Sequence, residues 1–307
     1  MSRDLLDGSR WLKRAVWWVA GYGATVLPLP LSRLVAHAVG DLMWLVDARG
    51  RRTVTRNLLP VVPSAEARAR VARAMYRACT AQVLFTLRLG TVSPATVSPA
   101  AVLPATALKT LGELRLVGPW HALPARGAVV IATLHADWDA LLLALTATGL
   151  LAEVAVAALP AGDAAVDRQL AALRAAAGAA TIPWERAAGG CLRELRAGRA
   201  VGVLADRAYS AAAIEVRVGS ERLRLPAGPL ELARRTGCPF MPMACVRMTG
   251  RTLLVCTHPL DPVRDGMDAC VRAWARFQLR VLAANPSRWV AFHPVWAART
   301  AADLSGA

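Results

Sequence analysis

The chain has 307 residues, 55% of them hydrophobic and 19% charged, which excludes a disordered protein and suffices for one large domain or two modest ones. Lysine and arginine outnumber aspartate and glutamate by 37 to 21, and the resulting net charge of +16 predicts an anionic partner. The sequence has no zinc-knuckle spacing, no RNA-binding aromatic strand and no lysine-rich tail, so we expect no nucleic-acid partner but rather a membrane surface or an acyl carrier.

The first distinctive segment is the apolar stretch over residues 11–31. It carries no charge between Arg14 and Arg33, but its glycines and prolines leave fewer than the roughly 20 uninterrupted apolar residues that a span needs. Trp17 and Trp18 lie beside two cations, which suits a segment in the membrane interface. A buried first helix of a soluble domain is the equal alternative, and a full transmembrane span is the least favoured.

Helical periodicity dominates residues 31–115. Apolar residues recur at helical spacing after Ser32, a suitable N-cap, and a long amphipathic helix follows Ser64. The stretch Gly90–Thr106 is rich in proline, serine and threonine and is expected to be a connecting loop. We therefore assign residues 1–110 to a helical N-terminal region and candidate membrane-interface anchor.

From about residue 113 the pattern changes to strands that alternate with helices. This alternation predicts an α/β fold with a mostly parallel central sheet flanked by helices, as one integrated core over residues 111–300. Ligands should then bind at the carboxyl edge of the sheet. The expected strands lie within residues 112–118, 127–134, 153–159, 200–206, 239–248 and 251–260, and a hairpin is expected around Gly219-Ser220.

The stretch ATLHADWD, residues 132–139, places His135 at the end of a predicted strand and before a predicted helix. Such a position suits a general base with an acidic partner. The alternative is structural, because Asp137 or Asp139 could simply cap the helix. The five histidines are scattered and the six cysteines include no CxxC pair, so we expect no metal site and reduced cysteines.

Nucleophile-elbow, P-loop and dinucleotide-binding motifs are also missing from the sequence. A histidine near a carboxylate, without a partnered nucleophile, points to a base that deprotonates a substrate hydroxyl or amine. No resident cofactor is implied.

Five motifs, in order, resemble the lysophospholipid acyltransferase superfamily. The likeness covers about residues 10 to 297 and lies in the branch of the lipid A lauroyl and myristoyl acyltransferases, nearest the actinobacterial phosphatidylinositol mannoside acyltransferases. The motifs are RRTVTRNL (Arg51–Leu58), ATLHADWD (132–139), AVGVLADR (Ala200–Arg207), the segment 222–242 with its Pro-x-Gly-Pro turn, and NPSRWVAFHPVW (Asn285–Trp296).

The resemblance implies an acyltransferase that uses acyl-CoA or acyl carrier protein as co-substrate and has no covalent acyl-enzyme. His135 would be the general base, and Asp139 would take the place of the acidic residue in the family's H-x4-D block. Asp206 would be a second acidic residue near the histidine, and Arg207 would neutralise phosphate or hold Asp206. Arg174 would face the cleft. The other implied substrate-binding residues are Asp137, Trp138, Pro226 and Gly228.

Two departures from the family pattern stand out. The family spacing falls on Ala140, whereas this chain has H-x3-D, and one residue turns a helical side chain by roughly 100°. Asp139 could still reach His135, Asp137 could replace it, or the pair could be broken. Ala157 and Ala158 stand where the relatives carry an acidic-arginine pair, which argues against the same phosphorylated glycolipid acceptor.

The main hypothesis is therefore a peripheral enzyme at the cytoplasmic face of the cell membrane. It would move a fatty acyl group from a CoA or acyl-carrier-protein thioester to a hydroxyl of a lipid or glycolipid, and would bind an anionic membrane surface. One alternative is a repurposed relative that acts on a small-molecule or carrier-bound hydroxyl or amine. The other is a non-catalytic homologue.

Overall fold

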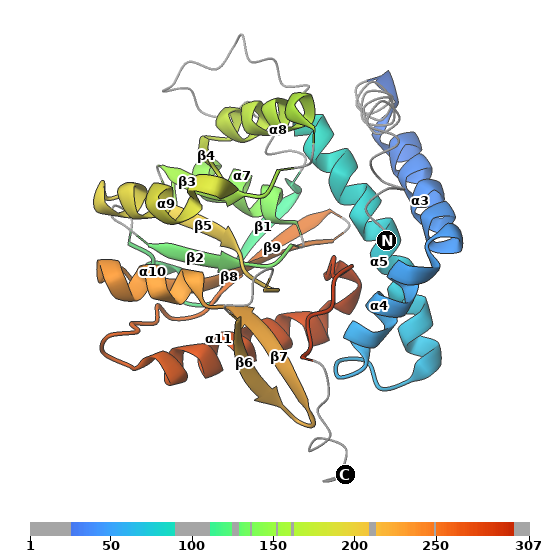
Figure 1. Cartoon of the computed structure of the whole chain (residues 1–307). Coiled ribbons are helices and arrows are strands. Elements are labelled where there is room, and N and C mark those ends of the chain that lie inside the picture. Colours follow the sequence, from blue (N-terminus) through green and yellow to red (C-terminus); the bar gives the residue numbers. More distant parts are fainter. Residues whose placement is uncertain are drawn as a thin grey trace.

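The computed structural model describes residues 26–89, 111–124, 129–135, 137–151, 153–160, 163–208, 213–248 and 250–297. The expected loop at Gly90–Thr106 and most of the apolar stretch 11–31 lie outside these residues. Within them the chain is an α/β protein whose helical N-terminal part precedes a mostly parallel sheet (Figure 1). The predicted fold class is thus confirmed.

Three helices form the described part of the N-terminal region: α3 (Leu29–Val46), α4 (Ala48–Leu58) and α5 (Ala65–Leu89). Asp47 lies between the first two and accepts a hydrogen bond from the backbone N–H of Gly50 at 2.7 Å, which caps α4. Helix α3 packs along α5, where Arg73 and Arg77 both bind the Asp41 carboxylate. These contacts hold the three helices together at one side of the sheet (Figure 1).

The central sheet has seven strands in the order β1-β9-β8-β2-β5-β3-β4, and every neighbouring pair is parallel except β8 with β9. All six predicted strand regions are confirmed. The strands are β1 (Glu113–Val117), β2 (Val130–Thr133), β3 (Val154–Ala158), β4 (Ala179–Pro183), β5 (Ala200–Leu204), β8 (Phe240–Met248) and β9 (Arg251–Cys256).

Helices cover both faces of this sheet, as its largely apolar strands require. Side chains alternate between the faces, so that Ile131 belongs to one hydrophobic cluster and Val130 to the other. Helix α7 packs in the first cluster, whereas α9, α10 and α11 pack in the second, together with residues of α4 and α5. The helices are α7 (Trp138–Ala147), α8 (Ala164–Ala176), α9 (Ala187–Arg196), α10 (Gly228–Thr236) and α11 (Met267–Ala284).

A two-stranded hairpin of β6 (Ala213–Val218) and β7 (Glu221–Pro226) projects from the core (Figure 1). It turns at Gly219 and Ser220, as predicted, and Gly219 adopts a φ of 59°, which glycine tolerates. The closing segment, Arg288–Trp296, starts at the last residue of the short helix η4 (Pro286–Arg288) and ends beside β7, because Leu223 and Trp296 form an isolated antiparallel bridge. This closing segment therefore touches both the hairpin and the N-terminal helices.

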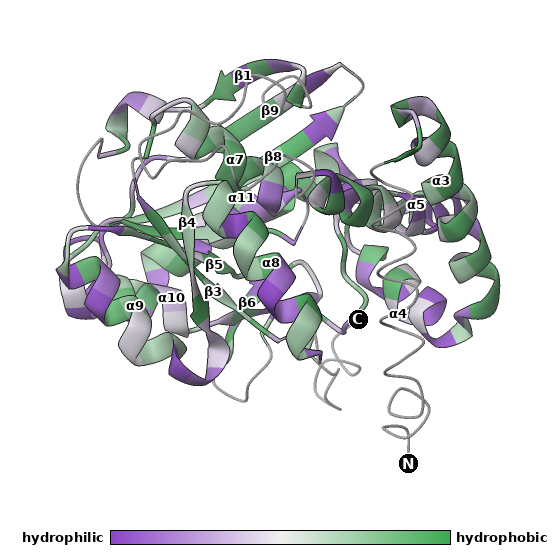
Figure 2. Ribbon diagram, turned by 90° about the horizontal axis from the view of Figure 1, so that it is seen from above, coloured by the Kyte–Doolittle hydropathy of each residue, from purple (hydrophilic) through white to green (hydrophobic). Residues whose placement is uncertain are grey.

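Among the described residues, one helix, α3, has the length and the apolar composition to cross a membrane. Only 17% of its apolar window is buried. Figure 2 shows it largely in the hydrophobic colour at the margin of the molecule. Its exposed large hydrophobic side chains are Leu29, Leu31, Leu34, Val35, Val39, Leu42, Met43, Leu45 and Val46.

Candidate active site

The sheet register brings His135 and Asp206 together. Strands β2 and β5 are parallel neighbours in which Thr133 lies opposite Leu204. His135 and Asp206 each lie two residues beyond those positions, at the carboxyl edge of the sheet. The His135 Nδ1 atom is hydrogen-bonded to the Asp206 Oδ1 atom, and the His135 backbone N–H donates to Oδ2 at 3.3 Å. A carboxylate 71 residues away in sequence is thus the partner of the histidine.

Asp206 is completely buried, and its carboxylate is held from several sides. The indole N–H of Trp289 donates to Oδ2 at 3.1 Å, as the His135 backbone N–H also does, and the Gln278 amide of α11 fixes the backbone of Asp206 by donating to its main-chain carbonyl at 3.1 Å. Burial alone would raise the pKa of Asp206. The charge and hydrogen bonds of His135, together with the charge of Arg207, outweigh burial and hold that pKa below its ordinary value. Asp206 is therefore ionised at neutral pH and orients the imidazole.

The hypothesis that Asp139 orients His135 does not match the geometry. Asp139 lies in the first turn of α7 and points toward α5, where it accepts a hydrogen bond from the Thr86 hydroxyl at 2.6 Å. Burial is the main influence on Asp139 and raises its pKa, against the hydrogen bond from Thr86 and the nearby charge of Arg174. The helix begins at Trp138, so its first turn carries the Asp139 side chain away from the sheet edge. Asp139 is a buried support for the helix rather than the partner of His135.

Asp137 precedes helix α7 but does not cap it through its side chain. Its side chain makes no capping hydrogen bond, and its φ of 47° is left-handed, which is uncommon for a residue other than glycine. Its carboxylate accepts a hydrogen bond from the Arg247 backbone N–H at 3.1 Å and lies 3.6 Å from the Arg288 guanidinium. Asp137 thus ties the turn after His135 to β8 and to the closing segment. Burial raises the pKa of Asp137, and the two arginines oppose that rise.

His135 lies at a cavity of about 720 Å³. From β2 the cavity passes the carboxyl ends of β5 and β3 and is bounded by α9 and α10. Six of the nine predicted site residues line it: His135, Trp138, Arg174, Arg207, Pro226 and Gly228. The three aspartates, Asp137, Asp139 and Asp206, lie behind this lining.

Most of the cavity wall is apolar, with Ala157, Ala158 and Leu159 from β3 and its end facing α9. The charged groups are few. The Arg174 guanidinium lies 4.7 Å from the centre of the Trp138 ring, and its buried Nε atom has no hydrogen-bond partner. An apolar cavity with a histidine and only a few charged side chains suits a long apolar ligand that carries one polar reacting group.

Cys191 of α9 also lines the cavity. Burial raises the pKa of this thiol to about 11. The thiolate, and not the thiol, is the nucleophile in cysteine catalysis. Cys191 therefore remains protonated at neutral pH and serves as an apolar part of the wall. Among the described residues, no group of three or more histidines, cysteines, aspartates and glutamates could hold a metal ion.

Sequence reasoning missed the individual roles of Thr86, Trp289 and Asn57. Asn57 of α4 is buried and donates to the carbonyls of Ala291 and His293 at 2.9 and 2.7 Å. The motifs around Asn57 and Trp289 were recognisable. Nothing in them indicated that Asn57 would bind Ala291, which lies 234 positions later in the sequence. Partial burial, together with the nearby charges of Arg207 and His135, lowers the pKa of His293.

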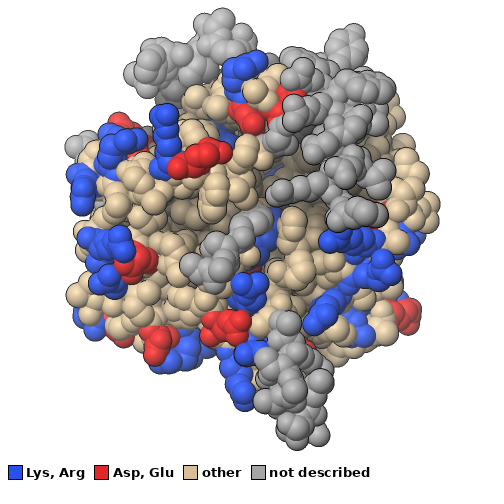
Figure 3. Space-filling model, viewed as in Figure 1, with Lys and Arg blue, Asp and Glu red and all other residues tan. Residues whose placement is uncertain are grey.

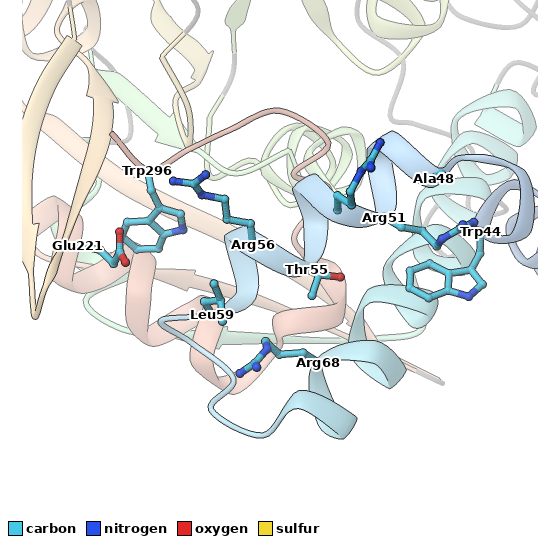
Figure 4. Close-up of a pocket in the computed structure, with 10 residues that line it drawn as sticks. Trp44, Ala48, Arg51, Thr55, Arg56, Leu59, Arg68, Glu221 and Trp296 are labelled. Atoms are coloured by element: carbon cyan, nitrogen blue, oxygen red, sulfur yellow. Dashed lines mark hydrogen bonds between the residues drawn. The ribbon is translucent and has the colours of Figure 1, made fainter. Parts of the chain in front are cut away.

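A second cavity, of about 840 Å³, lies over α4 (Figure 4). Arginines dominate its lining and Glu221 is its one acidic residue; the others are Trp44, Ala48, Arg51, Arg52, Thr55, Arg56, Leu59, Arg68 and Trp296. Arg51 and Arg68 also bind backbone carbonyls near the ends of α3 and α4, for example Arg51 to Leu45 at 2.6 Å and Arg68 to Val62 at 2.8 Å. This α4 groove has the charge to attract anions, but it contains none of the residues around His135.

Comparison with known proteins agrees with this architecture. A partial match of 112 residues, 33% identical, relates the chain to the phosphatidylinositol mannoside acyltransferases of two Mycobacterium tuberculosis strains, CDC 1551 / Oshkosh and ATCC 25618 / H37Rv. It covers 36% of this chain and 34% of each relative, so about a third of the relatives' length is spanned. The profile of the family described as bacterial lipid A biosynthesis acyltransferase matches residues 3–298. The chain therefore belongs to the bacterial lipid A biosynthesis acyltransferase family.

Proposed function

We propose that the protein transfers a fatty acyl group from a thioester of coenzyme A or an acyl carrier protein to a hydroxyl of a lipid acceptor. The observation that carries this proposal is the pair of His135 and Asp206 at the polar end of a largely apolar cavity of about 720 Å³. The cavity suits an acyl chain, and the ionised Asp206 suits a histidine that must take up a proton.

In this mechanism Asp206 holds the proton of His135 on Nδ1, so that Nε2 is the basic nitrogen. Nε2 takes the proton of the acceptor hydroxyl while the hydroxyl oxygen attacks the carbonyl carbon of the thioester. The carbon–sulfur bond then breaks, and the departing thiolate takes that proton back from His135. Asp206 stabilises the imidazolium that exists between the two proton transfers. The protonated thiol of Cys191 speaks against an acyl-cysteine intermediate.

The direct test uses purified protein with palmitoyl-CoA and a phosphatidylinositol mannoside in mixed micelles. His135→Ala should lower acyl transfer by about 10²- to 10⁴-fold, the usual contribution of a general base. The release of free CoA and the acylated lipid are both measured, and circular dichroism checks that the variant is folded. Unchanged product formation by His135→Ala would refute the assignment of the base.

A second candidate is transfer to a small-molecule or carrier-bound hydroxyl or amine. The observation that favours it is the lining of the cavity by Ala157 and Ala158, which provide no charged group for a phosphorylated glycolipid. If the wild-type protein consumes acyl-CoA with soluble alcohols or amines but with none of the lipids, this second candidate replaces the first. If no acceptor of either kind is acylated, both are wrong and a non-catalytic role follows.

We also propose that the protein docks on the cytoplasmic surface of an anionic membrane through α3 and the α4 groove. The apolar face of α3 and the arginines of the groove meet at Trp44, which lies in the last turns of α3 and lines the groove (Figure 4). Figure 3 shows basic side chains gathered over α4. An apolar face that enters the lipid beside cations at headgroup level is the usual pattern of an interfacial helix.

Vesicle co-sedimentation tests the docking. Arg52 and Arg56 have no acidic partner among the described residues, and each should contribute about 1 kcal/mol toward an anionic surface. Replacing both by glutamine should weaken binding to phosphatidylglycerol vesicles roughly thirtyfold, with little effect on phosphatidylcholine vesicles. The matched control replaces Arg193 and Arg196, which are exposed on α9. Equal losses in both double variants would contradict docking through α4.

A further inference from the structure

The closing segment from Arg288 to Trp296 is clamped at one end by a single buried amide. The Asn57 side chain donates to the carbonyls of Ala291 and His293, and its Oδ1 atom accepts from the Val295 backbone N–H at 3.3 Å. The Asn57 carbonyl also accepts from the Trp296 indole N–H at 3.0 Å. Asn57 is 1% exposed, so water cannot substitute for these bonds and the segment has one defined position on α4.

At its other end the same segment binds the carboxylates of Asp206 and Asp137, which lie near His135 in the structure or the sequence. Trp289 is fully buried and donates to Asp206 Oδ2 at 3.1 Å, whereas its neighbour Arg288 lies 3.6 Å from Asp137 Oδ2. Asp206 is the hydrogen-bond partner of the imidazole. Asp137, two residues after His135, forms a turn with a left-handed backbone conformation. Two adjacent residues of the segment therefore contact the carboxylate that binds His135 and the turn that follows His135.

The Trp289 contact decides how the Asp206 carboxylate is oriented. The terminal torsion of an aspartate is soft, so a carboxylate in a fixed position can still rotate. Here Oδ2 accepts from Trp289 and from the His135 backbone, which leaves Oδ1 directed at His135 Nδ1. A proton transfer depends on such alignment, and supporting residues with locked positions maintain it.

We infer that Trp289 and Asn57 are positioning residues for the reaction. The closing segment, which Asn57 binds, transmits the position of α4 to the pair of His135 and Asp206. Neither residue touches the substrate in this inference. Trp289 orients Asp206 directly, and Asn57 acts through the segment. The inference builds on the proposed function, since it takes His135 as the reacting base.

The decisive comparison is between two tryptophan-to-phenylalanine variants. Trp289→Phe keeps an aromatic ring but removes the hydrogen bond to Asp206. Trp274→Phe is the control, because Trp274 is equally buried in α11, packs edge-to-face on Phe240 and makes no hydrogen bond to Asp206. We expect kcat to fall on the order of tenfold in Trp289→Phe, with KM for the acyl donor within about twofold, and to stay near the wild-type value in Trp274→Phe.

A spectroscopic readout needs no substrate. A hydrogen bond from Nδ1 to a buried carboxylate gives a downfield proton resonance, which His135→Gln and Asp206→Asn assign by its loss. In Trp289→Phe this resonance should exchange with water on the order of tenfold faster, whereas Trp274→Phe should retain it. Indistinguishable kcat values and exchange rates in the two phenylalanine variants, at similar melting temperatures, would overturn the inference.

A double-mutant cycle tests the link to α4. If Asn57 acts through Trp289, the kcat loss of the variant with both Asn57→Ala and Trp289→Phe is smaller than the product of the two single losses. A purely multiplicative result contradicts that link. If Asn57→Ala does not fold, the comparison of the two phenylalanine variants still decides the role of Trp289. In one outcome the wild type is active, His135→Ala is inactive, and Trp289→Phe is unchanged in kcat and in proton exchange. That result refutes this inference while leaving the proposed function intact.

Discussion

The pairing of His135 with Asp206 predicts that Asp206→Asn and Asp139→Asn differ sharply. Asp206 Oδ2 receives two N–H donors and Oδ1 binds the Nδ1 atom of His135. An asparagine has only one oxygen for these two sides. If its oxygen faces the imidazole, its NH2 group meets the N–H groups of Trp289 and His135. If it is flipped, the NH2 group donates to Nδ1 and forces the proton of the neutral ring onto Nε2, which abolishes the base.

Either orientation of the Asp206→Asn amide should therefore remove most of the general-base contribution, about 10²- to 10⁴-fold in kcat. In Asp139→Asn the new amide oxygen can still accept from the Thr86 hydroxyl, so kcat should change less than about threefold. The assay follows CoA release and lipid acylation at saturating palmitoyl-CoA, normalised to the folded fraction. An Asp139→Asn variant as inactive as Asp206→Asn would refute this interpretation of the site.

Three further predictions concern the cavity and the buried carboxyl groups. Ala157→Leu should narrow the cavity wall at β3, so that palmitoyl transfer falls at least tenfold relative to octanoyl transfer in a competition assay, and an unchanged ratio would contradict acyl binding there. Cys191→Ala should keep kcat within about threefold, because a thiol with a pKa of about 11 is protonated at neutral pH; a trapped acyl thioester on Cys191 in mass spectrometry would show otherwise. Burial raises the pKa of Asp139 above its unfolded value, so its stabilising contribution is complete at low pH and is lost as pH rises through the folded pKa. Asp139→Asn should thus gain stability relative to wild type in urea unfolding between pH 4 and pH 8, and a constant difference would refute this pH linkage.

Much of the fold could be predicted because its signals are local. Short apolar runs that alternate with amphipathic segments specify strands and helices wherever they occur, and the residues 130–133 that precede His135 are buried on both faces of the sheet. The position of His135 at a strand end followed from this pattern alone. The family resemblance, and not the local pattern, supplied the predicted residues that line the cavity, among them Arg207 and Gly228 just beyond the ends of β5 and β7.

Local spacing could not identify the partner of the histidine, although the family resemblance placed Asp206 near it. In sequence, Asp137 and Asp139 are the nearest carboxylates to His135, and local spacing favours them. The left-handed turn at Asp137 and the start of α7 at Trp138 direct these two side chains toward Arg247 and Thr86. Sequence proximity was misleading here because a helix entrance distributes consecutive side chains around its axis.

By itself, the sequence determined the α/β class, the helical N-terminal part, the strand that presents His135, and the acyltransferase resemblance. The family resemblance placed Asp206 near His135. Only the tertiary structure decided that β2 lies next to β5, so that Asp206 and not Asp139 is hydrogen-bonded to the imidazole, and that Asn57 and Trp289 join two ends of the chain at this site. The physical reason is that local conformation depends on neighbouring residues, whereas strand order and register depend on how distant apolar faces pack together.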